Sequence, residues 1–166
     1  LRLHPLAVED AVLGNQRPKI DIYEESMFVV LKTLRYVEAT SDVETGELML
    51  FVGDQLVLTV RRGEVNPLDG VRHRLEAESG LLGMGPLAVL HAVLDHIVDT
   101  YRAIDLRLLE DLENIEEAIF AGDRTVTGQE IYQLKREVLE FKRGALPLVI
   151  PLRRLVTGET RVQLPK

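Results

Sequence analysis

Residues 85–121 read GPLAVLHAVLDHIVDTYRAIDLRLLEDLENIEEAIFA, and this stretch predicts one long α-helix around which the chain is organised. Apolar residues recur at alternating steps of three and four, and within this stretch no proline follows Pro86. The repeating positions are Leu87, Leu90, Leu94, Ile97, Tyr101, Ile104 and Leu108. The first third is apolar nearly all round, whereas only one apolar stripe remains after Asp105. We therefore expect the helix to begin inside a core and to end outside it.

A second long helix is predicted after a turn at Gly122-Asp123. It starts at a capping box, Thr127-x-x-Glu130, and keeps an apolar heptad pattern from Ile131 to Leu155. Two long helices joined by a short turn favour an antiparallel hairpin with facing apolar seams. Opposite charges would support this pairing, because the first helix is acidic and the second is basic. The basic residues are Lys135, Arg136, Lys142 and Arg143.

Prolines and glycines divide the remaining sequence. A short helix starts at Pro5 and is stopped by Gly14, and residues 27–37 read as a central strand. The runs ELMLFV and QLVLTVR, joined by a Gly-Asp turn, predict a β-hairpin that follows the turn-rich segment TSDVETG at 40–46.

Further breaks are predicted on both sides of the long helix. A helix capped by Asn66-Pro67 should run to about Glu78 and end at Ser79-Gly80. Pro147 and Pro151 should kink the second long helix, and Thr157-Gly158 should break it again.

Composition limits the possible functions. The 166 residues suit one ordinary core with a helical arm, and the net charge of −7 argues against nucleic acid as a partner. The chain has no cysteine, which excludes thiolate metal sites and suits a reducing, cytosolic compartment. No apolar run reaches the roughly 18 residues of a membrane span, and no enzyme motif is present. We predict that the chain is not an enzyme, and that it is a piece of a longer protein.

Acidic residues form two candidate cation positions. His91, Asp95 and Asp99 lie at steps of four on one face of the long helix, with Arg102 next along it. Such a stack suits either a hard cation or carboxylates that pair with arginines. Glu9 and Asp10 are a second acidic pair, but adjacent helical residues point about 100° apart. They are therefore either a solvated face or ligands that need a further chain.

Several segments resemble the cytoplasmic domain of the CorA family of magnesium and cobalt transporters. They are HPLAVEDAVLGNQRPKIDIYEESMFVVLKTLRY, LVLTVRRG, GPLAVLHAVLDHIVDTY and IYQLKREVLEFKRGALPL. The resemblance implies an α/β/α sandwich around a mixed, partly antiparallel sheet, followed by a long antiparallel helical hairpin. On this basis residues 1–84 are the sandwich portion, without its first strands, and residues 85–166 are the arm and the start of a stalk helix.

The same resemblance implies a function. In this family five subunits surround one pore, and Mg²⁺ bound between cytoplasmic domains holds the pore shut. The intersubunit ligands correspond to Asp10, with Glu9 beside it, and to Asp95, while Asp99 lies near that position with a weaker claim. Mg²⁺, or Co²⁺, would be both regulatory ligand and transported ion. The full-length protein would lie in the cell (inner) membrane through C-terminal helices beyond Lys166, with this part on the cytoplasmic side.

Two other functions remain open from the sequence. A zinc transporter of the related ZntB kind would share the scaffold, although no His or Cys cluster points to zinc. A soluble interaction module could instead use the acidic arm, residues 110–117, to bind a basic partner.

Overall fold

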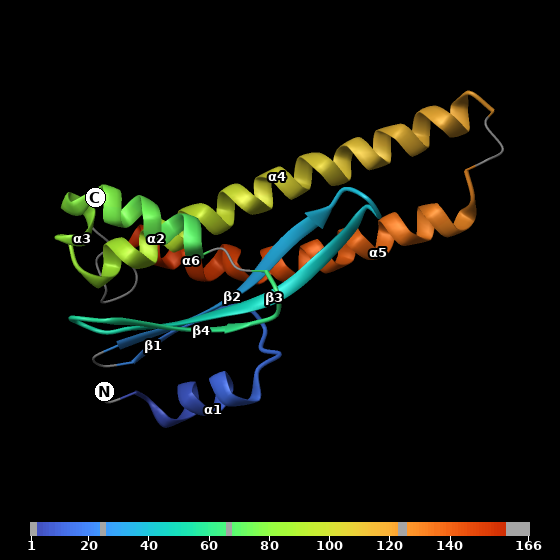
Figure 1. Ribbon diagram of the computed structural model, residues 1–166. Helices are drawn as coiled ribbons and strands as arrows, with labels where there is room; N and C mark the ends of the chain where they lie inside the picture. Colours follow the sequence, from blue (N-terminus) through green and yellow to red (C-terminus); the bar gives the residue numbers. More distant parts are fainter. Residues whose placement is uncertain (1–2, 24–25, 66–67, 123–125, 159–166) are drawn as a thin grey trace.

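The computed structural model describes residues 3–23, 26–65, 68–122 and 126–158. Figure 1 shows a sheet with helices on both sides and two long helices that extend past it. In chain order the elements are α1 (Pro5–Leu13), β1 (Lys19–Tyr23), β2 (Ser26–Val37), β3 (Asp42–Val52), β4 (Val57–Arg62), α2 (Leu68–Ala77), α3 (Ser79–Leu82), α4 (Pro86–Phe120), α5 (Gly128–Ala145), the 3-10 helix η1 (Leu146–Leu148) and α6 (Val149–Thr157). The predicted α/β/α arrangement is confirmed.

The sheet is a simple meander. Its described strands lie in the order β1-β2-β3-β4, and each neighbouring pair is antiparallel. The predicted central strand is therefore β2, between β1 and β3, and the predicted hairpin is β3–β4. The family resemblance implies a mixed, partly antiparallel sheet, and the pairs within the described residues are all antiparallel.

Helices cover both faces of the sheet, and this explains why β2 and β3 read as nearly continuous apolar runs. Successive side chains of a strand point to opposite faces. On one face, Phe28, Val30, Met49 and Phe51 pack with Ala7 and Ala11 of α1. On the other face, Met27, Val29, Leu31, Leu48, Leu50 and Val52 join the larger cluster that includes α4. Every one of these sheet side chains is at most 5% exposed.

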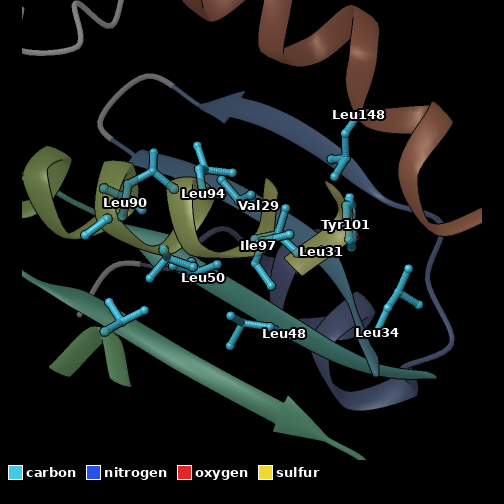
Figure 2. Packing of buried hydrophobic residues seen from close by; sticks show 14 of the residues in the cluster. Val29, Leu31, Leu34, Leu48, Leu50, Leu90, Leu94, Ile97, Tyr101 and Leu148 are labelled. Carbon is cyan, nitrogen blue, oxygen red and sulfur yellow. The ribbon is translucent and has the colours of Figure 1, made fainter. Parts of the chain in front are cut away.

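The first half of α4 lies across the second of these faces. Figure 2 shows its side chains packed against those of β2 and β3. The α4 residues labelled there are Leu90, Leu94, Ile97 and Tyr101. Burial stops at Leu108, since no α4 residue from 109 to 120 is buried. The prediction that this helix begins inside the core and ends outside it is confirmed.

The predicted turn at 40–46 is wrong in its extent. β3 already begins at Asp42, and Val37 pairs with Asp42, so the turn contains only residues 38–41. Tertiary contacts explain the longer strand. Val43 is 7% exposed, and its N–H donates to a carboxylate oxygen of Glu137 on α5 at 2.7 Å. Packing against α5 thus outweighs a local composition that favours a turn.

The two long helices are antiparallel, but their seams do not face each other along the whole length. Figure 1 shows the β2–β3 turn reaching between α4 and α5. Tyr36 donates from its hydroxyl to Asp111 of α4 at 2.6 Å, and Gln133 of α5 donates to the Thr40 carbonyl at 3.0 Å. Ile131, predicted as a seam residue, is 47% exposed because the turn separates the helices.

The predicted charge pairing between the two helices is also wrong for the described residues. Arg136 pairs with Asp42 and Glu137, and Arg143 pairs with Glu140 on its own helix. None of the ion pairs among the described residues joins α4 to α5. Arg136 is instead neutralised by Asp42 at the start of β3 and by its neighbour on α5, Glu137.

The predicted helix ends are mostly confirmed. The Thr127–Glu130 capping box forms, and η1 separates α5 from α6 at Pro147. α6 ends at Thr157 and is capped by Gly158, whose φ of 70° is left-handed. Ser79-Gly80, predicted to end a helix, instead open the short α3. The predicted positions Asn66-Pro67 and Asp123 lie outside the described residues, as does 159–166.

Apolar residues from both sides of residue 85 contribute to one cluster. The division into a sandwich portion, 1–84, and an arm, 85–166, stays a prediction.

Substitution of Gly46 in β3 would test how closely the sheet is packed. A Cβ at this position would lie 2.5 Å from Thr33 Oγ1 and 2.8 Å from the Arg62 carbonyl oxygen. We expect Gly46→Ala to lower the free energy of unfolding by about 1–3 kcal/mol, measured by urea denaturation. Gly70→Ala is the control, because no atom lies within 4 Å of a Cβ there and alanine favours the helix by about 0.5–1 kcal/mol. Equal midpoints for the two variants would contradict this packing.

Ionisation of Tyr101 should lower the free energy of unfolding at alkaline pH. Its hydroxyl donates to the Lys32 carbonyl at 2.5 Å, and burial raises its pKa well above the ordinary value. In the unfolded chain the pKa of a tyrosine is about 10. Because the pKa is higher in the folded protein, the full stabilising contribution is present below about pH 10 and is lost as the pH rises further. Between pH 7 and pH 11 we expect the wild type to lose about 1.4 kcal/mol more than Tyr101→Phe. The exposed Tyr132→Phe is the control, and parallel pH profiles for all three proteins would exclude this contribution.

Candidate functional site

The four predicted metal-ligating residues lie on opposite sides of the sheet. Glu9 and Asp10 belong to α1, which packs on the face that carries Phe28. Asp95 and Asp99 belong to α4, which packs on the face that carries Val29. Figure 1 shows α1 and α4 separated by the sheet. One subunit therefore cannot bring both acidic positions to the same ion.

The helical geometry of α1 explains how its two acidic residues differ. Ala7 and Ala11, one turn apart, bury one side of the helix. Asp10 borders that buried side and is half-buried, whereas Glu9 points about 100° further round and is exposed. The two carboxylates face different surroundings, as the sequence predicts.

Asp10 is held by one lysine, which it shares. Lys19 Nζ lies 2.7 Å from a carboxylate oxygen of Asp10 and 2.7 Å from one of Asp21. Desolvation alone lowers the pKa of Lys19, but the hydrogen bonds to Asp10 and Asp21 outweigh it, so the pKa is raised. The lysine therefore stays charged, and it would keep one carboxylate partner if Asp10 turned elsewhere.

Asp95 is paired with an arginine of another helix. Arg74 Nη2 of α2 lies 3.0 Å from a carboxylate oxygen of Asp95, and both side chains are more than 40% exposed. Ala88 and Ala92 of α4 are buried, and Asp95 follows one turn later on the same side of the helix. Sequence reasoning places Arg102 nearest to this acidic face, and it misses Arg74 because α2 approaches α4 only in the folded chain.

Asp99 and His91 are exposed on the same face of α4. Among the described residues, no three His, Cys, Asp or Glu side chains come close enough to share a metal ion. The structure therefore brings the predicted ligands to the surface but does not assemble them within one chain. Their role in metal binding stays a prediction.

Two further carboxylates, Glu47 and Glu137, are nearly fully buried, and sequence reasoning does not single them out. Glu47 accepts from the Asn15 backbone N–H at 2.8 Å and from Lys32 Nζ at 2.6 Å. Glu137 accepts from the Val43 backbone N–H and, at 2.9 Å, from Arg136 Nε. Hydrogen bonds satisfy both groups, so their role is to hold the loop before β1 and the start of β3 in place. Glu137 lies outside the predicted apolar positions of α5, so the sequence pattern gives no signal for its burial.

Within the described residues, no helix is both long and apolar enough to cross a membrane.

Comparisons with known proteins identify relatives over almost the whole chain. YfjQ of Bacillus subtilis, provisionally named as a metal ion transporter, is 30% identical over 145 residues, which are 87% of this chain and 44% of that protein. The cobalt/magnesium transport protein CorA of Thermotoga maritima is 27% identical over 147 residues, 88% of this chain and 42% of that protein. The chain thus spans less than half the length of these relatives.

A solved structure with the same fold is the soluble domain of CorA from Methanocaldococcus jannaschii. It has a TM-score of 0.70 at 20% identity and covers 96% of this chain and 64% of that one. The profile of the family described as "CorA-like Mg2+ transporter protein" matches residues 1–164. The chain therefore belongs to the family of CorA-like Mg²⁺ transporter proteins.

Proposed function

We propose that this chain is the cytoplasmic, ion-sensing part of a pentameric magnesium/cobalt transporter that lies in the cell (inner) membrane. Its family membership and the names of its relatives support transport of Mg²⁺ or Co²⁺ by the full-length protein. In this proposal the same ions also bind between neighbouring copies of the chain and gate the pore.

The observation that carries the proposal is the position of Asp10 and Asp95 on opposite faces of one sheet. Both carboxylates keep exposed surface, with 25% of the Asp10 side chain and 44% of the Asp95 side chain accessible. In a closed ring with head-to-tail contacts, the side of one subunit that carries α1 would meet the side of its neighbour that carries α4. Asp10, with Glu9, could then share one ion with the neighbour's Asp95, while Asp99 is the weaker candidate.

The surroundings of these carboxylates suit a weakly bound, hydrated ion. Mg²⁺ gives up its water reluctantly and is often held by a few carboxylates through retained waters. Asp10 and Asp95 are each neutralised by one partly exposed cation, and such pairs contribute only about 0.2–1 kcal/mol. At ten times its Kd, an ion adds about 1.4 kcal/mol to the state that binds it, and several sites in a ring would add together. Weak sites of this kind can respond to an abundant ion.

Nothing specific in the described residues favours zinc or a soluble interaction module over this proposal. The candidate ligands are carboxylates, which magnesium prefers, whereas zinc favours imidazole and thiolate.

The ligand assignment can be tested in the full-length protein. We expect millimolar Mg²⁺ to raise the melting temperature of the detergent-solubilised oligomer and to slow its proteolysis. Asp10→Asn and Asp95→Asn should each raise the Mg²⁺ midpoint by about tenfold, because each removes a charge from the shared site. Asp105→Asn, an exposed charge on the same helix as Asp95, should leave the midpoint unchanged. Unaltered midpoints in both ligand variants would refute the shared site.

Lys19 and Arg74 would compete with Mg²⁺ for the carboxylates, so removing them gives a second test in which the Mg²⁺ midpoint should fall. Lys19→Met and Arg74→Gln remove the partners of Asp10 and Asp95, so each should lower the Mg²⁺ midpoint by about two- to fivefold. Arg72→Gln is the matched control, because Arg72 lies on α2 but pairs with Glu76. Weaker Mg²⁺ binding in Lys19→Met or Arg74→Gln would show that these cations support the ion site and do not compete with it.

A further inference from the structure

A groove of 470 Å³ lies between the loop that joins α1 to β1 and the end of α5, apart from the proposed ion ligands. Arg17 of the loop lines one side, and Lys142, Arg143 and Leu146 from α5 and η1 line the other. Lys32 of β2 also lines the groove. This volume is within the range of sites that bind small organic molecules, about 300–1,000 Å³.

The charge of the groove is opposite to that of the chain. The chain has a net charge of −7, yet four cationic side chains and no carboxylate line this hollow. Lys32 is neutralised by Glu47, and Arg143 by Glu140. Arg17 and Lys142 form no ion pair with any carboxylate in the described part of the chain. Two unpaired cations from different elements thus approach one hollow, where an anion would relieve their repulsion.

Arg17, the cation on the loop side of the groove, extends from a fixed backbone. Gly14 and Asn15 have φ values of 66° and 55°, and the Asn15 N–H donates to the buried Glu47. Pro18, which is buried, follows Arg17 directly. Arg17 therefore extends from a backbone that needs little ordering when a ligand binds, which favours affinity.

The other side of the groove, formed by α5 and η1, adds apolar surface. Leu139 and Leu146 line the groove and are 42% and 56% exposed, so their side chains are free to cover a ligand. Apolar contacts beside a charged end suit a molecule that has both an anionic group and a less polar body.

We propose that this groove binds a small organic phosphate of nucleotide size. Arg17 and Lys142 hold the phosphate oxygens, since a guanidinium can bind phosphate with two parallel hydrogen bonds and an ammonium acts as a point charge. Leu139 and Leu146 cover the organic part. A compact polyphosphate presents several charges at one point, whereas an acidic peptide spreads single charges along its length, so the small hollow favours the phosphate.

The experiment uses isothermal titration of the 166-residue chain with ATP in EDTA, which removes divalent ions and so keeps the result independent of the ion-sensing proposal. We expect ATP to bind and inorganic tripolyphosphate to bind more weakly. Arg17→Gln and Lys142→Gln should each weaken ATP binding by about tenfold. Lys135→Gln, an exposed lysine on the same helix outside the groove, should leave it unchanged. Leu139→Ala should weaken binding of ATP but not of tripolyphosphate.

Three results would overturn the proposal. The first is no heat of binding and no ATP-dependent rise in melting temperature for the wild type. The second is an equal loss of affinity in Lys135→Gln and Lys142→Gln, which would indicate attraction by overall charge. The third is tripolyphosphate binding as tightly as ATP, which would leave no role for the apolar wall. Because all four substitutions are at exposed positions, circular dichroism should show each variant folded as the wild type.

Discussion

Burial of both faces of the β2–β3 pair is the interaction on which the rest of this structure depends. Alternate side chains of these strands enter two different clusters, one under α1 and the other under α4. Fully burying an aliphatic side chain contributes about 1.5–3 kcal/mol, whereas an exposed ion pair contributes about 0.2–1 kcal/mol. The apolar layers therefore fix where α1 and α4 lie, and the charged residues on those helices take the positions that result.

The same two strands also position the helical arm. Because β2 and β3 continue past the main core, their turn lies between α4 and α5. Tyr36 at the end of β2 donates to Asp111 of α4, and Gln133 of α5 donates to the Thr40 carbonyl in the turn. The buried Glu137 adds a hydrogen bond from α5 to the backbone of β3. The arm is thus attached to the sheet at the point where its helices separate. A shift of the arm at this level would have to break hydrogen bonds to the sheet.

The acidic positions follow from this layering. With α1 and α4 on opposite sides of the sheet, Asp10 and Asp95 cannot meet within one chain, and each is neutralised locally by a single cation. The groove beside α5 has the opposite character, because its cations exceed the available carboxylates. The chain is therefore acidic overall but has separate surface regions suited to cations and to anions.

The sequence by itself determined the elements whose signals are local. The three-and-four spacing from Leu87 to Leu108 specifies α4, Thr127 and Glu130 specify the start of α5, and Pro147 specifies its interruption, since each acts through its own backbone or its own helix face. Only the tertiary structure decided that β3 begins at Asp42, that the β2–β3 turn separates the long helices, and that Arg74 and Lys19 pair with the candidate ligands. These outcomes depend on contacts between residues distant in sequence, and periodicity and turn composition carry no information about such contacts.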